Sequence, residues 1–161
     1  ACRNETRVEE DSSNVDVPPV RQLFRGFIGL SGVYDIGAHL KHEQARGVAE
    51  ISPMTPACGG QAGFAAASPL HVARGLSQYV AARLPPTLLL HGAADVTVGP
   101  GASRTFAEAL VSRGAHARCV VRDGVGHADV VVELMENGAA GGAAQAIARF
   151  CMDHALQTAR L

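Results

Sequence analysis

Two apolar runs constrain this 161-residue chain most strongly, because each breaks into a glycine-rich loop that offers one ionisable side chain. The first run covers residues 87–90 and continues into HGAAD, which ends at Asp95. The second covers residues 117–121 and continues into DGVGHAD, which contains His127. Short, nearly continuous apolar runs are typical of strands covered on both faces, as in a parallel sheet. Residues 102–113 between them have apolar residues at helical spacing, so the pattern predicts a strand–helix–strand crossover.

The same alternation extends to both sides of this unit. Residues 27–30 read as a short buried strand bounded by glycines, and residues 128–136 begin a helix that the AAGG stretch interrupts. Residues 143–158 read as a final helix, whose inward face we expect to hold Ile147, Ala148, Cys151 and Met152. The pattern predicts an α/β fold with about three parallel strands and flanking helices.

The composition changes along the chain indicate a polar start followed by one folded domain. Residues 1–19 are polar and charged and end in two prolines, so we interpret them as a linker or connecting loop and residues 20–161 as the domain. Residues 37–86 lack a clean strand pattern and contain helical fragments with Gly-rich and Pro-rich breaks. An insertion of this kind between two core strands is typical of a cap or of one side of a pocket.

Charge and hydropathy argue against several classes of function. A formal net charge of −1 gives no electrostatic reason to expect a nucleic-acid partner or an anionic membrane surface. No run approaches the roughly 18 apolar residues of a transmembrane helix, so we expect no transmembrane segment and a soluble protein as given. The four cysteines are scattered without zinc or disulfide spacing, so we expect no metal site, with Cys119 and Cys151 as buried thiols.

Asp95 and His127 are the candidate catalytic residues. They lie 32 positions apart (127 − 95), and since the carboxyl ends of neighbouring parallel strands share one edge of a sheet, we expect the two side chains to meet there. A carboxylate that fixes the tautomer of an imidazole makes that imidazole an effective base for a serine hydroxyl. The alternatives are a turn aspartate that binds local backbone groups and an exposed loop histidine.

Other polar residues have structural explanations. Ser31 lies in GLSGV, but a nucleophile elbow needs glycine two residues after the serine, where Val33 stands. We expect His91 to stabilise its loop by hydrogen bonding, and Asp129 to cap the helix that starts beside it. The remaining histidines have no spacing that argues for chemistry: His39, His42, His71, His116 and His154.

With these motifs, the chain resembles the C-terminal part of α/β hydrolases of the esterase and lipase type. HGxxD and GxGH are shared across many esterases and indicate only the superfamily. SGVYD, HEQARG and the ASPL near Ser68 are similar to isoprenylcysteine alpha-carbonyl methylesterases, plant enzymes that demethylate prenylated protein C-termini. The resemblance spans about residues 24–138.

The resemblance implies a serine triad with Asp95 as the acid and His127 as the base, and no cofactor or metal. In these hydrolases the serine comes first along the chain, in a Gly-x-Ser-x-Gly stretch that this sequence does not contain. We therefore expect the nucleophile before residue 1, in an N-terminal half that also covers the apolar edge of the first strand. The family also implies association with the endoplasmic reticulum or Golgi membrane.

The expected function is hydrolysis of a carboxylic ester, the methyl ester of a prenylcysteine in a small molecule or a prenylated peptide. Another carboxylesterase or a formamidase-like hydrolase would share the triad and differ in the pocket, which residues 37–86 line in part. The third alternative is a truncated, non-catalytic module that binds a partner through the exposed sheet edge.

Overall fold

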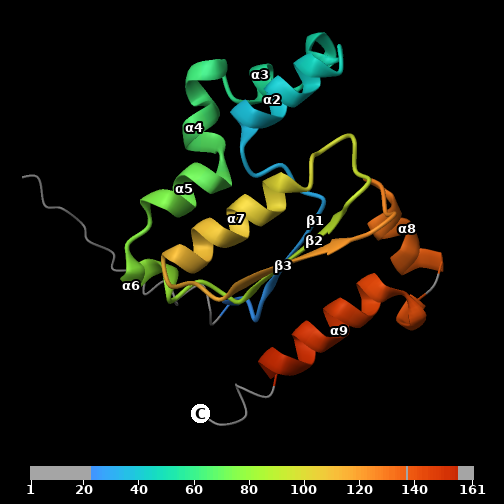
Figure 1. Ribbon diagram of the computed structural model, residues 1–161. Helices are drawn as coiled ribbons and strands as arrows, with labels where there is room; N and C mark the ends of the chain where they lie inside the picture. The colour runs from blue at the N-terminus through green and yellow to red at the C-terminus, as the bar shows by residue number, and fades with distance from the viewer. Residues whose placement is uncertain (1–22, 137, 156–161) are drawn as a thin grey trace, which may run out of the picture.

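A three-stranded parallel sheet lies at the centre of the computed structural model, which describes residues 23–136 and 138–155. Its strands, in the spatial order β1-β2-β3 (Figure 1), are β1 (Phe27–Leu30), β2 (Thr87–Gly92) and β3 (Ala117–Arg122). β1 pairs with the first four residues of β2, and β3 pairs with all six. The α/β fold with three parallel strands that the sequence predicts is thus confirmed.

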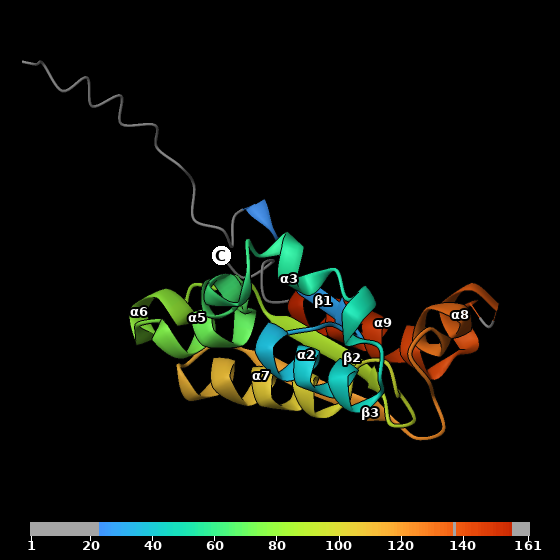
Figure 2. The same ribbon diagram turned by 90° about the horizontal axis from the view of Figure 1, so that it is seen from above.

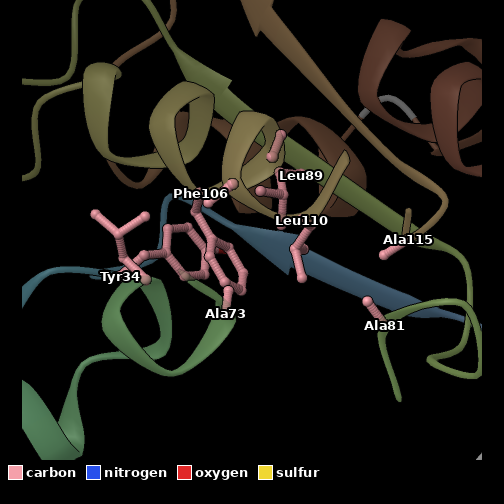
Figure 3. Close-up of a cluster of buried hydrophobic side chains, with 10 residues drawn as sticks. Tyr34, Ala73, Ala81, Leu89, Phe106, Leu110 and Ala115 are labelled. Carbon is pink, nitrogen blue, oxygen red and sulfur yellow. The ribbon is translucent and has the colours of Figure 1, made fainter. Parts of the chain in front are cut away.

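Helices cover both faces of the sheet. Successive residues of β2 point to opposite sides, and because both sides are covered every one of them is buried. On one face, Leu89 packs with α5 (Pro69–Gly75) and α7 (Gly101–Ser112) in the cluster drawn in Figure 3. On the other face, Leu88 and Leu90 pack with α8 (Asp129–Glu136) and α9 (Gly142–Ala155). Figure 2 shows α7 and α9 on opposite sides of the strands.

The segment between β1 and β2 is helical throughout its regular parts. Its elements are α2 (Ile36–Ala45), η1 (Ala49–Ile51), α3 (Met54–Ala57), η2 (Gln61–Gly63), α4 (Phe64–Ala67), α5 and α6 (Gln78–Ala81). A small core of Ile36, Leu40 and Phe64 holds α2 and α4 together. The buried Ser68 hydroxyl joins them as well, because it accepts from the Ile36 N–H (3.0 Å) and donates to the Phe64 carbonyl (2.6 Å).

The inward face of α9 differs from the expected one. Met152 is 59% exposed and Cys151 is also exposed, whereas Ala143 and Phe150 are buried beside Ile147. Positions 143, 147 and 150 share a face at helical spacing, and Phe150 is the largest side chain available to fill the space under β2. The buried thiol expected at Cys151 is therefore wrong. The expected C-terminal end of the helix, at residue 158, lies outside the described residues.

Two smaller expectations also need correction. Phe27 is 46% exposed although its strand was expected to be buried, because β1 has a single neighbour in the described sheet. Cys119 is only partly buried. Within the described part of the chain, no helix is both long and apolar enough to cross a membrane.

Candidate active site

The loop after β2 holds the carboxylate of Asp95 in a buried position. Its side chain has no exposed surface. Its Oδ1 accepts backbone N–H bonds from Thr97 (2.9 Å) and Val98 (2.8 Å). This is the turn chemistry for which aspartate is favoured. Asp95 thus makes the local turn bonds considered for it from the sequence, and its Oδ2 remains for other partners.

Backbone hydrogen bonds join this loop to the loop after β3. The N–H of Ala93 donates to the Arg122 carbonyl (2.7 Å), and the N–H of Ala94 donates to the Val125 carbonyl (3.0 Å). At Gly92 the approach is so close that a Cβ atom would overlap the Val125 carbonyl group. Glycine is required there for its small size. The two loops therefore lie side by side at one end of the sheet (Figure 1).

The peptide that precedes His127 is held by the side chain of Asp129. The N–H of Gly126 donates to Oδ2 of Asp129 at 2.7 Å. Asp129 is the first residue of α8, and we expected it to cap that helix. Its carboxylate instead turns back to the loop, because the glycine-rich turn brings the Gly126 N–H over it. Asp129 thereby helps to fix the position of His127.

Asp95 and His127 meet where these two loops adjoin. Nδ1 of His127 lies 2.8 Å from Oδ2 of Asp95, and since a carboxylate only accepts, Nδ1 donates. Burial alone would raise the pKa of Asp95. Hydrogen bonds from Val98, His127 and Thr97 and the nearby His127 charge outweigh burial, so this pKa lies below its usual value. Asp95 is therefore a charged carboxylate at neutral pH.

The ring of His127 is oriented for proton transfer on its other side. Its side chain is 42% exposed, and Nε2 has no hydrogen-bond partner among the described residues. With Nδ1 protonated and bonded to a buried carboxylate, Nε2 of neutral His127 is a free base that faces outward. A hydroxyl placed against Nε2 would complete an acid–base–nucleophile arrangement.

His91, the penultimate residue of β2, lies directly behind this pair. It is fully buried, its Nδ1 lies 2.7 Å from Oγ of Ser103, and its Nε2 lies 2.8 Å from the Val98 carbonyl oxygen. The same Nε2 lies 3.0 Å from Oδ2 of Asp95. The hydrogen-bonding role expected for His91 is confirmed. Its contact with the Asp95 carboxylate was not foreseen, although a spacing of four residues across a turn could have suggested it.

The helical segment also touches the loop that carries Asp95. Nε2 of His42, on α2, lies 2.8 Å from the Val96 carbonyl oxygen, and Arg46 donates to the Thr97 carbonyl (3.4 Å). No spacing in the sequence singles out His42. A hollow of about 400 Å³ opens beside these contacts, between α2, α5 and the start of α7.

Ser31 follows β1 and is buried. Its φ of 47° is the one positive value at a non-glycine position among the described residues. Its N–H donates to the Leu90 carbonyl (2.9 Å), and its Oγ is buried without a hydrogen-bond partner in the described structure. A buried hydroxyl is poorly placed to meet a substrate. No group of three potential metal ligands occurs among the described residues.

Comparison with protein families gives one match over most of the chain. A sequence model of the prolyl oligopeptidase family matches residues 19–154. A probable isoprenylcysteine alpha-carbonyl methylesterase of Arabidopsis thaliana is 30% identical over 135 residues, which are 83% of this chain and 28% of that protein. Another probable isoprenylcysteine alpha-carbonyl methylesterase, from Oryza sativa subsp. japonica, is 34% identical over 109 residues, 68% of this chain and 26% of that protein. The chain thus spans about a quarter of the length of these relatives.

Two solved structures are also similar. A puromycin-hydrolyzing peptidase of Mycobacterium tuberculosis matches with a TM-score of 0.47 and 23% identity, over 65% of this chain and 15% of that one. An acylaminoacyl peptidase of Pyrococcus horikoshii matches with a TM-score of 0.49 and 17% identity, over 68% of this chain and 17% of that one.

Proposed function

Because the chain belongs to the prolyl oligopeptidase family, a family of the α/β-hydrolase fold, we propose that it supplies the acid and the base of a serine-type carboxylic ester hydrolase. The observation that supports this most directly is the 2.8 Å contact between Oδ2 of Asp95 and Nδ1 of His127. It pairs a buried, charged carboxylate with a half-exposed imidazole whose Nε2 faces outward.

In the proposed reaction, His127 moves the proton and Asp95 orients it. A serine Oγ attacks the ester carbonyl while its proton passes to Nε2 of His127, and the imidazolium then gives that proton to the leaving alkoxide. A water molecule, deprotonated by the same Nε2, then attacks the acyl-enzyme, and the imidazolium returns the proton to the departing serine Oγ as the free acid is released. Throughout, the negative charge of Asp95 stabilises the imidazolium through Nδ1–H.

We propose that the serine lies in the parent protein before residue 1. No Gly-x-Ser-x-Gly stretch occurs in the sequence, and Ser31 is buried with Val33 in the place of the second glycine. The relatives are almost four times longer than the region they share with this chain. In chain order the serine would then precede Asp95, and Asp95 precedes His127.

For the substrate, we propose the methyl ester of a prenylcysteine, whose hydrolysis releases methanol and a free carboxylate. The support is the methylesterase activity for which relatives 30–34% identical to this chain are named. The helical residues 37–86 would line part of the pocket, beside the hollow next to the Asp95 loop. The methylesterase resemblance of the sequence motifs is the sole basis on which we also propose association with the endoplasmic reticulum or Golgi membrane. Amide or peptide hydrolysis is the second candidate, which membership of the prolyl oligopeptidase family favours.

The test is a kinetic comparison in the parent protein, expressed with the sequence upstream of residue 1. We expect His127→Ala and Asp95→Asn to lower kcat/KM for an ester by about a thousandfold or more, with His127→Ala the worse because this residue moves the proton itself. His116→Ala is the control, since His116 precedes β3 and so lies at the end of the parallel sheet opposite the loops that carry Asp95 and His127. The kcat/KM of this control variant should stay near the wild-type value.

The substrate arm compares a prenylcysteine methyl ester with its unprenylated counterpart and with a matched amide. A pocket shaped for the prenyl chain should favour the first ester by much more than the roughly 10- to 200-fold that a single methylene supplies. Equal rates on the two esters would reject the methylesterase proposal, and faster cleavage of the amide would favour the second candidate. Full activity of His127→Ala would reject the proposed hydrolase mechanism altogether.

A further inference from the structure

His91 occupies an unusual place for a histidine, in the fully buried central strand and in contact with the candidate acid. Both of its ring nitrogens face polar atoms: Nδ1 faces Oγ of Ser103, and Nε2 faces the Val98 carbonyl oxygen and Oδ2 of Asp95. The Val98 peptide also donates its N–H to Oδ1 of Asp95 (2.8 Å). His91 therefore contacts the carboxylate both directly and through the turn that holds it.

These contacts define which nitrogen of His91 is protonated. Nε2 lies beside two acceptors, a carbonyl and a carboxylate, so it must carry hydrogen. Nδ1 of the neutral ring is then an acceptor, and the Ser103 hydroxyl donates to it. The phenol of Tyr34 reaches Ser103 in turn; burial raises the pKa of Tyr34 to about 12, with the Ser103 hydrogen bond acting in the opposite direction. The phenol therefore stays protonated at neutral pH.

These contacts form a buried row, in which the Ser103 hydroxyl donates to Nδ1 of His91, and Nε2–H of His91 donates to the Val98 carbonyl with Oδ2 of Asp95 at 3.0 Å from the same nitrogen. The Asp95 carboxylate lies at the end of this row, and it also accepts a hydrogen bond from Nδ1 of His127. Ser103 and His91 are fully buried and the Asp95 side chain has no exposed surface, so water does not replace these contacts. Each group in this buried row leaves its neighbour only one hydrogen-bonding role, donor or acceptor, so the row has a single arrangement of hydrogen bonds.

We propose that His91 is a positioning residue for the Asp95–His127 pair: its Nε2–H side fixes the Asp95 carboxylate in the orientation that keeps Nδ1 of His127 protonated and Nε2 free. The inference rests on the proposed function, in which Asp95 orients the base. His91 does not touch the reacting atoms and acts only through Asp95. Ser103 supports it by holding the ring in the required tautomer.

A histidine that merely filled the core would have a different effect when replaced. His91→Leu fills similar space but leaves the Val98 carbonyl and Oδ2 of Asp95 without the N–H beside them, in a region closed to water. The turn that holds the carboxylate of Asp95 then no longer keeps it in a single orientation. His91→Gln restores an N–H at the position of Nε2, because the glutamine Nε2 is as far from the backbone as that ring nitrogen.

The experiment reads the ring nitrogens of His127 by ¹⁵N–¹H NMR correlation in the 161-residue chain, which requires no catalytic activity. In the wild type, we expect neutral His127 to be almost entirely in the Nδ1–H form. In His91→Leu this form should fall to a minor fraction, and in His91→Gln it should return to the majority. Ser103→Ala, which deletes one hydroxyl and preserves the packing, should give an intermediate loss and provides the test if His91→Leu does not fold.

Leu89→Ala is the matched control for destabilisation. Leu89 lies two residues before His91 on the same face of β2, in the buried apolar cluster that faces α7. It makes no polar contact with Asp95. It should lower the free energy of unfolding and leave the His127 tautomer unchanged. An unchanged tautomer in Ser103→Ala and in folded His91→Leu, or an equal shift in Leu89→Ala, would overturn the proposal.

The result separates this inference from the proposed function. A wild-type chain with the Nδ1–H form of His127 and the expected response to His91→Leu supports the positioning role, even if the parent protein fails to hydrolyse esters. A wild-type chain without the Nδ1–H form overturns the positioning role and removes the geometric support for the triad as well.

Discussion

Among single residues, Asp95 combines two properties that normally oppose each other, since its side chain is buried and yet charged. Burial disfavours the charged form, and the hydrogen bonds from Val98, His127 and Thr97 favour it more strongly. The carboxylate thus contributes to the stability of the fold as well as to the candidate site.

This balance predicts a specific pH dependence of stability. The folded-state pKa of Asp95 lies below its unfolded-state value, near 3.9, so its stabilising contribution is complete above that pH and is lost as the pH falls through the folded pKa. We expect the free energy of unfolding, measured with urea, to fall less steeply below about pH 4 in Asp95→Asn than in the wild type. Asp123→Asn, an exposed carboxylate without a hydrogen-bond partner in the described structure, is the control and should keep the wild-type slope. Parallel curves for Asp95→Asn and wild type would contradict the prediction.

The sequence could identify Asp95 and His127 because each follows a recognisable strand in a glycine-rich loop. The parallel arrangement then requires the two loops to share one edge, and the model brings the side chains together as expected. The hydrogen bonding of His91 was expected, but its contact with Asp95 was not, because that contact depends on how residues 93–98 turn back over the end of β2.

Among the elements, the junction between β2 and the loop after β3 has the tightest steric requirement near the site. A methyl group at Gly92 would meet the Val125 carbonyl, which is backbone and cannot turn away as a side chain could. We expect Gly92→Ala to lower the free energy of unfolding by about 1–3 kcal/mol, as overpacking does. It should also weaken the Asp95–His127 contact by pushing the loops apart.

Gly75→Ala is the control for this substitution. Gly75 ends α5 with open space around its Cα, so alanine should be neutral or stabilising by up to about 1 kcal/mol. Urea unfolding of both variants provides the comparison. Equal stability of Gly92→Ala and the wild type would show that the two loops have room to separate.

The helix α9 allows a direct test of the corrected face. Phe150 is 4% exposed and packs under β2, whereas Met152 is 59% exposed. We expect Phe150→Ala to lower the free energy of unfolding by about 3–5 kcal/mol, and Met152→Ala to change it by no more than about 0.5 kcal/mol. A larger loss of stability in Met152→Ala than in Phe150→Ala would instead support the inward face of α9 expected from the sequence.

The strands and helices themselves were largely predictable, and the orientation of α9 was not. Apolar runs and glycine-rich breaks define β2 and β3, and α7 begins and ends within one residue of the expected positions. In α9, alanines on several faces of the helix make the apolar pattern ambiguous. Only packing against Leu88 and Leu90 selects the side that contains Phe150.

For the molecule as a whole, the structure brings the candidate acid and base together, and the one serine in an elbow-like stretch, Ser31, is buried. We therefore expect a fluorophosphonate probe to leave the purified 161-residue chain unlabelled, since the Ser31 hydroxyl is buried. The parent protein, with its upstream sequence, should be labelled under the same conditions. Labelling of the chain that Ser31→Ala abolishes would contradict this prediction and identify a different nucleophile.

The candidate acid and base follow the two strands of one strand–helix–strand crossover, β2–α7–β3, and this arrangement has an evolutionary consequence. Asp95 and His127 follow the two strands of that unit, and the backbone bonds between their loops are made within it. A single genetic event that copies, transplants or deletes this unit moves both groups together, with their alignment intact. If residues 37–86 line the pocket as proposed, substitutions there would change the substrate while the Asp95–His127 pair is inherited as one unit.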